Sequence, residues 1–102
     1  MFRDELIGAA CTLDAPQLRV RLGAWRDLRD RARAVEWVSD GVRLVLAADE
    51  PMAGVMDLVV SESECCAFYT FTASVEGPER RLEISAGPGG GPAVQALLGL
   101  DM

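Results

Sequence analysis

Two stretches of the chain carry apolar residues at the three- and four-residue spacing of an amphipathic helix. The apolar stripe of the first stretch consists of Leu18, Leu22, Trp25, Leu28 and Ala32. Asp14-Ala15-Pro16 stands just before it and supplies an acidic N-cap and a first-turn proline. The pattern therefore predicts a helix over residues 16–34.

The second helical stretch begins at Asp49-Glu50-Pro51, which offers the same start signal. We expect it to end near Cys66, where the spacing of apolar residues changes. The residues expected to share its apolar face are Met52, Val55, Met56, Val59 and Cys66. The residues expected to point outward are Asp57, Glu62 and Glu64.

Four shorter segments alternate as half-buried strands do. Residues 35–38 and 42–46 flank Ser39-Asp40-Gly41, and Asp-Gly between two such runs predicts a hairpin. Residues 68–75 and 81–85 flank the turn residues 76–79 and predict a second hairpin. Residues 86–92 are rich in glycine and proline and are expected to form a loop, and residues 93–98 a short closing helix.

The predicted element order is therefore α-β-β-α-β-β-α. This order favours a single α+β domain over residues 1–102, with one antiparallel sheet of about four strands and helices on one face. Residues 1–10 are expected to be a flexible N-terminal segment. The run AGPGGG lacks the lysine and the serine or threonine of a phosphate loop, so no nucleotide cofactor is expected.

Charge and composition narrow the classes of function. The net charge of −6 argues against direct nucleic-acid binding, which requires surplus cations. The chain has no histidine, and so lacks the usual general base and the commonest metal ligand. No secretory signal and no apolar stretch of membrane-spanning length is visible. Three cysteines, an odd number, fit a disulfide framework poorly and predict a reducing cytoplasm.

Chemical interest concentrates in the segment ESECCAFYTF, residues 62–71. A disulfide between Cys65 and Cys66 is disfavoured, because Cα atoms about 3.8 Å apart are closer than the usual disulfide span. With Cys11 they offer three thiolates, a set that suits a soft metal or metalloid ion better than structural zinc. Glu62 or Glu64 would complete a harder site. The alternative is that the cysteines pack as small buried apolar residues.

The chain also resembles a family of small actinobacterial domains that occur alone or fused behind the DNA-binding domain of mercury-resistance-type (MerR) regulators. The resemblance spans about residues 11–100. It rests on Cys11-Thr12-Leu13, Trp25, Gly41-Val42-Arg43-Leu44 and Glu64-Cys65-Cys66-Ala67-Phe68. It implies that the three cysteines form one set and that the domain senses or sequesters thiol-seeking species. Only ten residues precede Cys11, so we expect that this chain is not itself the DNA-binding regulator.

Three functions follow as hypotheses. The first is a binding module for mercury(II), arsenic(III) or an electrophile, with Cys11, Cys65 and Cys66 as ligands and an apolar wall of Phe68, Tyr69 and Phe71 nearby. The second is a non-catalytic domain that binds a small apolar ligand or forms a homodimer, in which the cysteines are structural. In that case Trp25, Trp37, Met52 and Met56 line an apolar groove.

The third hypothesis is a cysteine-dependent lyase, for which Glu62, Glu64 and Tyr69 are the local proton donors. Catalysis is disfavoured, because Cys-x-x-Cys is absent and no histidine can activate a nucleophile. No catalytic residue is therefore assigned.

Overall fold

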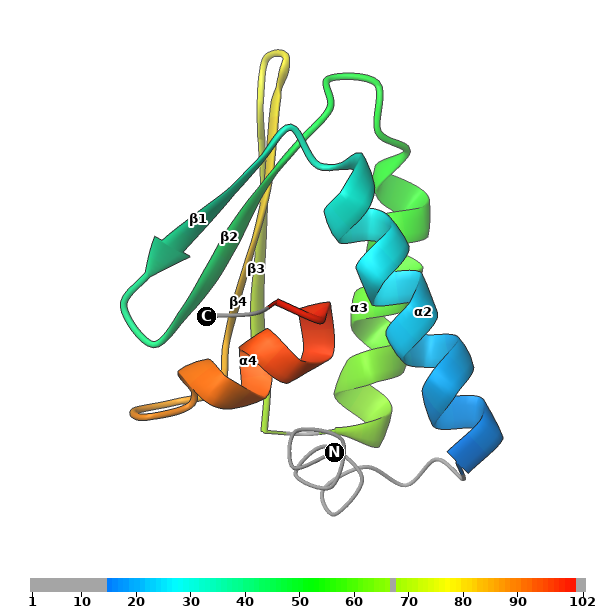
Figure 1. The fold of residues 1–102 in the computed structure, drawn as a ribbon. Helices are drawn as coiled ribbons and strands as arrows, with labels where there is room; N and C mark the ends of the chain where they lie inside the picture. The colour runs from blue at the N-terminus through cyan, green and yellow to red at the C-terminus, as the bar shows by residue number, and fades with distance from the viewer. Residues whose placement is uncertain (1–14, 67, 101–102) are drawn as a thin grey trace.

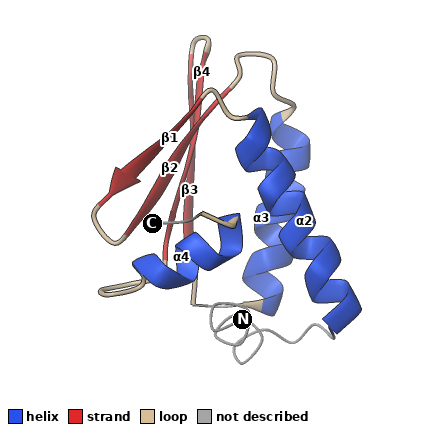
Figure 2. Ribbon diagram, viewed as in Figure 1, coloured by secondary structure: helices blue, strands red, loops and turns tan. Residues whose placement is uncertain are grey.

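A computed structural model describes residues 15–66 and 68–100. Within these residues the elements run in the predicted order, with three helices and a four-stranded antiparallel sheet (Figures 1 and 2). They are α2 (Ala15–Arg31), β1 (Ala34–Val38), β2 (Gly41–Leu46), α3 (Met52–Cys65), β3 (Thr70–Glu76), β4 (Glu79–Ser85) and α4 (Gly91–Leu98). The α+β class, the two hairpins and the element order are confirmed.

The ends of the first two helices differ from the prediction. Helix α2 ends at Arg31. Two residues later, just before β1, Arg33 donates its backbone N–H to Val45 O on β2 at 2.7 Å, so the chain has already turned toward the sheet. Helix α3 has Pro51 as its N-cap and no side-chain cap, so the expected acidic cap is wrong there. The predicted cap Asp14 of the first helix and the segment 1–10, expected to be flexible, lie outside the described residues.

Helix α4 begins at Gly91, so the predicted loop over residues 86–92 is shorter than expected. Pro92 falls in the first turn, where its missing N–H would have no partner within the helix. The second hairpin is also shifted, since β3 begins at Thr70 and β4 already at Glu79.

The first hairpin turns at Ser39-Asp40, and Gly41 is already the first residue of β2. Asp40 takes the left-handed conformation (φ 60°), which aspartate adopts more readily than most residues. Gly41 is needed for space, because a Cβ there would lie 2.1 Å from Ile84 O on β4.

The strand order is β1-β2-β4-β3, so β1 and β3 form the two edges of the sheet. On one face, Val42 pairs with Ile84 and Leu44 with Leu82, and all four side chains are fully buried. The helices cover this face: α4 packs on β2 and β4 and also against α2. Figure 1 shows α2 and α3 running side by side in opposite directions.

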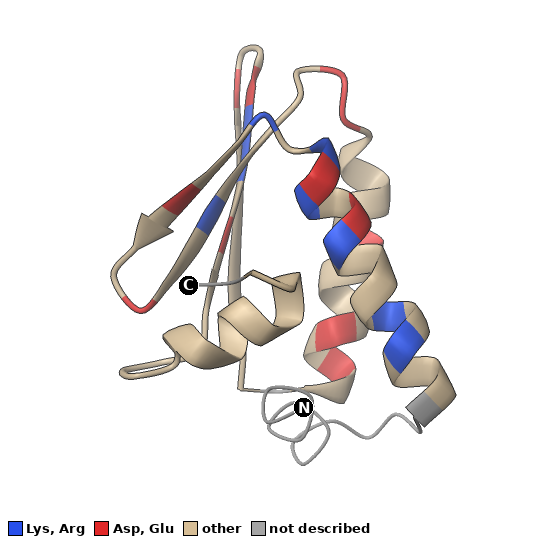
Figure 3. Cartoon of the chain, viewed as in Figure 1, with Lys and Arg blue, Asp and Glu red and all other residues tan. Residues whose placement is uncertain are grey.

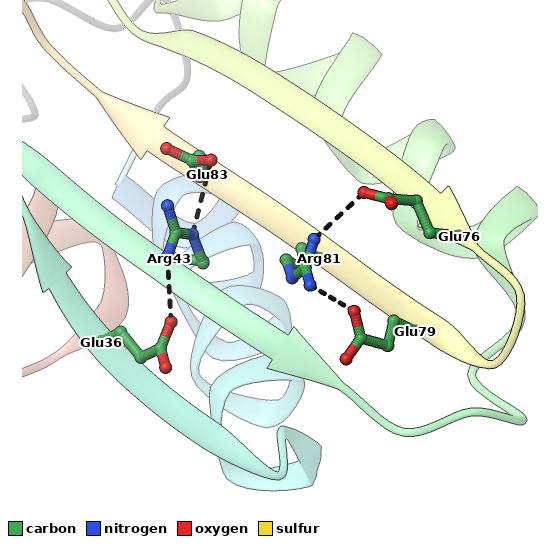
Figure 4. A network of polar contacts seen from close by, with 6 residues as sticks. All are labelled: Glu36, Arg43, Glu76, Glu79, Arg81 and Glu83. Atoms are coloured by element: carbon green, nitrogen blue, oxygen red, sulfur yellow. Dashed lines mark hydrogen bonds and ion pairs between the residues drawn. The ribbon is translucent and has the colours of Figure 1, made fainter.

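The other face of the sheet is polar and carries ion pairs across the strands (Figure 4). Arg43 on β2 donates to Glu36 Oε1 on β1 at 3.2 Å and lies 3.4 Å from Glu83 Oε2 on β4. The hydrogen bond to Glu36, together with the charge of Glu83, raises the pKa of Arg43. A second arginine, Arg81, pairs with both Glu76 and Glu79. This face is therefore a solvated charged surface, and only the helix face forms the core.

Among the helices of the described residues, none combines the length and the hydropathy that a membrane span requires.

Candidate functional site: the thiol end of the helix pair

The two adjacent cysteines lie where α3 ends, and the change in backbone direction separates them. Cys65 is the last helical residue, and Cys66 is the C-cap, with φ −128° and ψ 83°. The Cys66 N–H still donates to Glu62 O at 2.7 Å, which closes the final turn. Because Cys66 leaves the helical path, its side chain enters the core and is 0% exposed, whereas Cys65 stays half-buried. Neither forms a disulfide within the described chain.

The half-buried thiol of Cys65 faces helix α2 and its Arg21. Arg21 Nη1 lies 3.8 Å from Cys65 Sγ and donates to it. The same nitrogen lies 3.5 Å from Glu62 Oε1, one turn earlier on α3. Figure 3 shows that the beginning of α2 carries basic residues beside the acidic end of α3. The guanidinium thus bridges a carboxylate and a thiol.

Glu62 is buried, at 1% exposure, and its predicted outward orientation is wrong. Its Oε1 accepts a hydrogen bond of 2.8 Å from Trp25 Nε1, and Trp25 is itself fully buried. A buried carboxylate is costly unless it is paired and hydrogen-bonded, and here Arg21 and Trp25 supply both partners. The tryptophan that the apolar stripe assigned to the core therefore also orients the acid beside the thiol.

An aromatic cluster lies on the core side of this region. The rings of Trp25 and Phe71 stack at 5.4 Å with an interplanar angle of 9°. Tyr69 lies 5.9 Å from Phe71 and 4.3 Å from Phe68 between ring centroids. Tyr69 donates its hydroxyl to Ala93 O at 3.0 Å, so this side chain also links the start of β3 to α4. The predicted wall of Phe68, Tyr69 and Phe71 is thus one continuous aromatic group.

Two hollows lie along the helix pair. A hollow of about 390 Å³ adjoins the first turns of α2 and is lined by Pro16, Gln17, Val20 and Arg21. Among the described residues its lining comes from α2 alone, and Cys65 is not part of it. A cleft of about 500 Å³ lies at the opposite end of the pair, between Asp27 and Arg31 of α2 and the first turn of α3. There Arg31 holds the buried Glu50 through two contacts of 3.2 Å.

The structure places the predicted site residues in different surroundings at the end of α3. Glu62 and Cys65 both contact Arg21, Cys66 is buried in the core, and Glu64 is exposed. Phe68 and Tyr69 belong to the aromatic cluster. Cys11 and Ala67 lie outside the described residues. Within residues 15–66 and 68–100, no group of three acidic, histidine or cysteine side chains is arranged to hold a metal ion. Convergence of Cys11 on the pair stays a prediction.

The apolar groove of the second hypothesis does not form as expected. Trp25 is fully buried and so cannot line an open groove. Trp37 lies on the edge strand β1, and Met56 is exposed on α3. Neither hollow is lined by these residues or by Met52.

The pattern of the sequence did not single out Arg21, although it contacts both Cys65 and Glu62. The available signal was its spacing, because Arg21 and Trp25 are four residues apart and share one face of a helix. Comparison with protein-family models finds no match to this chain, and searches of curated proteins and of solved structures find none.

Proposed function

We propose that this protein is a thiol-based binding module that captures a soft metal ion, a metalloid or an electrophile at Cys65. The observation that carries the proposal is the pairing of a half-buried thiol with a guanidinium, Cys65 Sγ and Arg21 Nη1 at 3.8 Å. Reactive cysteines are typically found in partly exposed positions next to a cation, whereas inert ones are buried in apolar surroundings. Cys65 meets the first description and Cys66 the second.

Glu62 fixes the position of the guanidinium. It is held by the Trp25 N–H and cannot move without losing that hydrogen bond, so Arg21 remains anchored between the carboxylate and the sulfur. Soft thiolate ligands select soft ions, which gives the chemical class of the cargo.

In this proposal, Cys65 forms the first bond to the incoming ion or electrophile. Cys11 is the second thiol for an ion that needs two ligands. Cys66 supplies a third thiolate only if the end of α3 opens, because its sulfur is sealed in the core. A single dominant thiol in the native state is therefore expected.

Mercury(II) titration of the reduced protein, followed by thiolate charge-transfer absorbance, tests the proposal. We expect Cys65→Ser to weaken mercury(II) binding at least tenfold. Cys11→Ser should lower the affinity for ions that need two thiols. Cys66→Ser should reduce the stability of the fold more than the affinity for the ion. Glu64→Gln is the matched control, because Glu64 is an exposed neighbour of the thiol. Unchanged affinity in Cys65→Ser would refute the assignment.

The second candidate is a domain whose cysteines are structural, and the burial of Cys66 favours it for that residue. The two functions differ in native thiol reactivity. Under the structural alternative, Ellman's reagent modifies neither Cys65 nor Cys66 until the protein unfolds. Under the proposal, Cys65 reacts in the native state, and Cys65→Ser removes that reaction.

A further inference from the structure

The cleft of about 500 Å³ between α2 and α3 lies at the end of the helix pair opposite the thiol region, and we call it the interhelical cleft. Its apolar lining includes Leu28, Val55 and Leu58. Leu28 and Val55 belong to the hydrophobic core, at 1% and 2% exposure, so the cleft reaches down to the core. A largely apolar hollow of this size with a few polar groups is typical of small-molecule sites.

Two small residues leave room between the helices at this point. Ala24 on α2 and Gly54 on α3 both line the interhelical cleft. A Cβ at Gly54 would have no neighbouring atom within 4 Å, so no close packing requires glycine there. A larger side chain at Gly54 is therefore expected to take up space in the cleft.

One polar wall of the cleft is held in place from two sides. Glu50, in the loop before α3, is 8% exposed, and both of its carboxylate oxygens contact Arg31 of α2 at 3.2 Å. The backbone oxygen of Glu50 accepts a hydrogen bond of 3.2 Å from Arg80 Nη1 on β4. The wall is therefore formed before any ligand arrives, as ligand pockets usually are.

The charges of the cleft favour a cation. An anion would have to draw Arg31 away from Glu50 and leave a buried carboxylate unpaired, which is strongly unfavourable. Asp27 also lines the cleft, but it is exposed and makes no ion pair with the described residues, so its charge is available. Figure 3 shows acidic residues at this end of the helix pair, both on α2 and in the loop before α3.

We propose that the interhelical cleft binds a small amphipathic amine. The apolar body of the ligand packs against Leu28, Val55 and Leu58, and its protonated nitrogen pairs with Asp27 at the cleft opening. The net charge of −6 also favours the approach of a cation over that of an anion. This site is separate from Cys65 and does not depend on the thiol chemistry.

Titration of the full chain with phenethylamine, followed by the NMR shifts of leucine and valine methyl groups, tests the site. We expect saturable shifts centred on Leu28, Val55 and Leu58, with a dissociation constant on the order of millimolar for so small a probe. Phenethyl alcohol should bind at least threefold more weakly, and hydrocinnamate more weakly still, because only the amine pairs with Asp27. The advantage of the amine should shrink at high salt.

Two variants separate the charge of the cleft from its space. Asp27→Asn should weaken phenethylamine binding at least threefold and leave phenethyl alcohol unchanged, whereas Asp57→Asn, at an exposed carboxylate of α3 outside the cleft lining, should change neither. Gly54→Leu should abolish the binding of both probes, whereas Ser63→Leu, at an exposed position further along α3, should not. Leucine forms helices more readily than glycine, so Gly54→Leu is expected to remain folded.

The absence of saturable shifts at tens of millimolar amine, or shifts centred outside the cleft, would overturn the proposal. Equal affinity for phenethylamine and hydrocinnamate would do so too, because it would leave Asp27 without a role. Retention of both probes by Gly54→Leu, with its fold checked by circular dichroism, would show that they bind elsewhere. The comparison at Asp27 holds even if Gly54→Leu fails to fold, because Asp27 is exposed.

Discussion

Glu62 shows how one buried polar residue organises the thiol region. Its carboxylate receives the Trp25 N–H and the Arg21 guanidinium, and Arg21 in turn reaches Cys65. Removal of one partner from such a group leaves the other buried and unsatisfied, at a cost of roughly 1–3 kcal/mol. The stability of the core and the geometry around the thiol are therefore coupled through a single hydrogen bond.

This coupling predicts a non-additive mutant cycle between Trp25 and Glu62. Trp25→Phe removes the indole donor, and Glu62→Met removes the acceptor. Because the double variant loses both partners of one bond, its loss in free energy of unfolding should be smaller than the sum of the single losses by about 1–3 kcal/mol. Urea denaturation measures the free energy of unfolding of the two single variants and of the double variant.

The same cycle with Glu64→Met in place of Glu62→Met serves as the control, because Glu64 is exposed. That pair should be additive within about 0.5 kcal/mol. Additivity between Trp25 and Glu62 would show that the hydrogen bond contributes nothing specific to the core.

The sequence predicted part of this site and missed the rest for a physical reason. The adjacent cysteines and the aromatic residues after them stand out by type, so the location at the end of the second helix was predictable. The inward turn of Glu62 was not, because helical periodicity treats a carboxylate as solvent-facing unless a buried donor is known. That donor, Trp25, lies 37 positions away along the chain and meets Glu62 only after α2 packs beside α3.

At the scale of elements, the local sequence pattern identified each hairpin. It did not predict the order in which the four strands lie in the sheet. Alternation and the Asp-Gly signal are local, and they predicted β1 with β2 and β3 with β4. The central pairing of β2 with β4 joins residues about 40 positions apart and depends on burying both apolar faces under α4. At Gly41 strands β2 and β4 approach so closely that there is no room for a side chain.

Gly41→Ala should therefore disrupt the junction of β2 and β4. Its Cβ would lie 2.1 Å from Ile84 O, and a backbone oxygen within a strand ladder cannot move aside without weakening the pairing. We expect a loss of about 2–3 kcal/mol in the free energy of unfolding, as for other overpacked sites. Thermal or urea unfolding measures it.

Gly23→Ala provides the opposite expectation in the same protein. Gly23 lies within α2, and the position that an alanine Cβ would take there has no neighbouring atom within 4 Å. Alanine should therefore stabilise the helix by roughly 0.5–1 kcal/mol. Equal effects of the two substitutions would contradict the role assigned to the close approach at Gly41.

At the scale of the whole molecule, α4 connects the layers that hold the site. It covers β2 and β4, contacts α2, and receives the Tyr69 hydroxyl at Ala93 O. Its C-terminal end is fixed by Arg29 of α2, whose Nη1 donates to Leu98 O and Gly99 O at 2.8 Å each. Carbonyls at a helix C-terminus lack partners within the helix, so a guanidinium there satisfies them and favours the local dipole.

Arg29→Met should therefore loosen α4 more than it loosens the sheet. The substitution retains an apolar side chain in α2 but removes the charged donor of two carbonyls. We therefore expect the free energy of unfolding to fall by roughly 1.5–3 kcal/mol. Hydrogen exchange should accelerate in the amides of residues 93–100 more than in those of β2 and β4. Arg19→Met is the matched control, since Arg19 is an exposed residue of α2. Uniform acceleration across the sheet, or none in α4, would show that the helix is held by apolar packing alone.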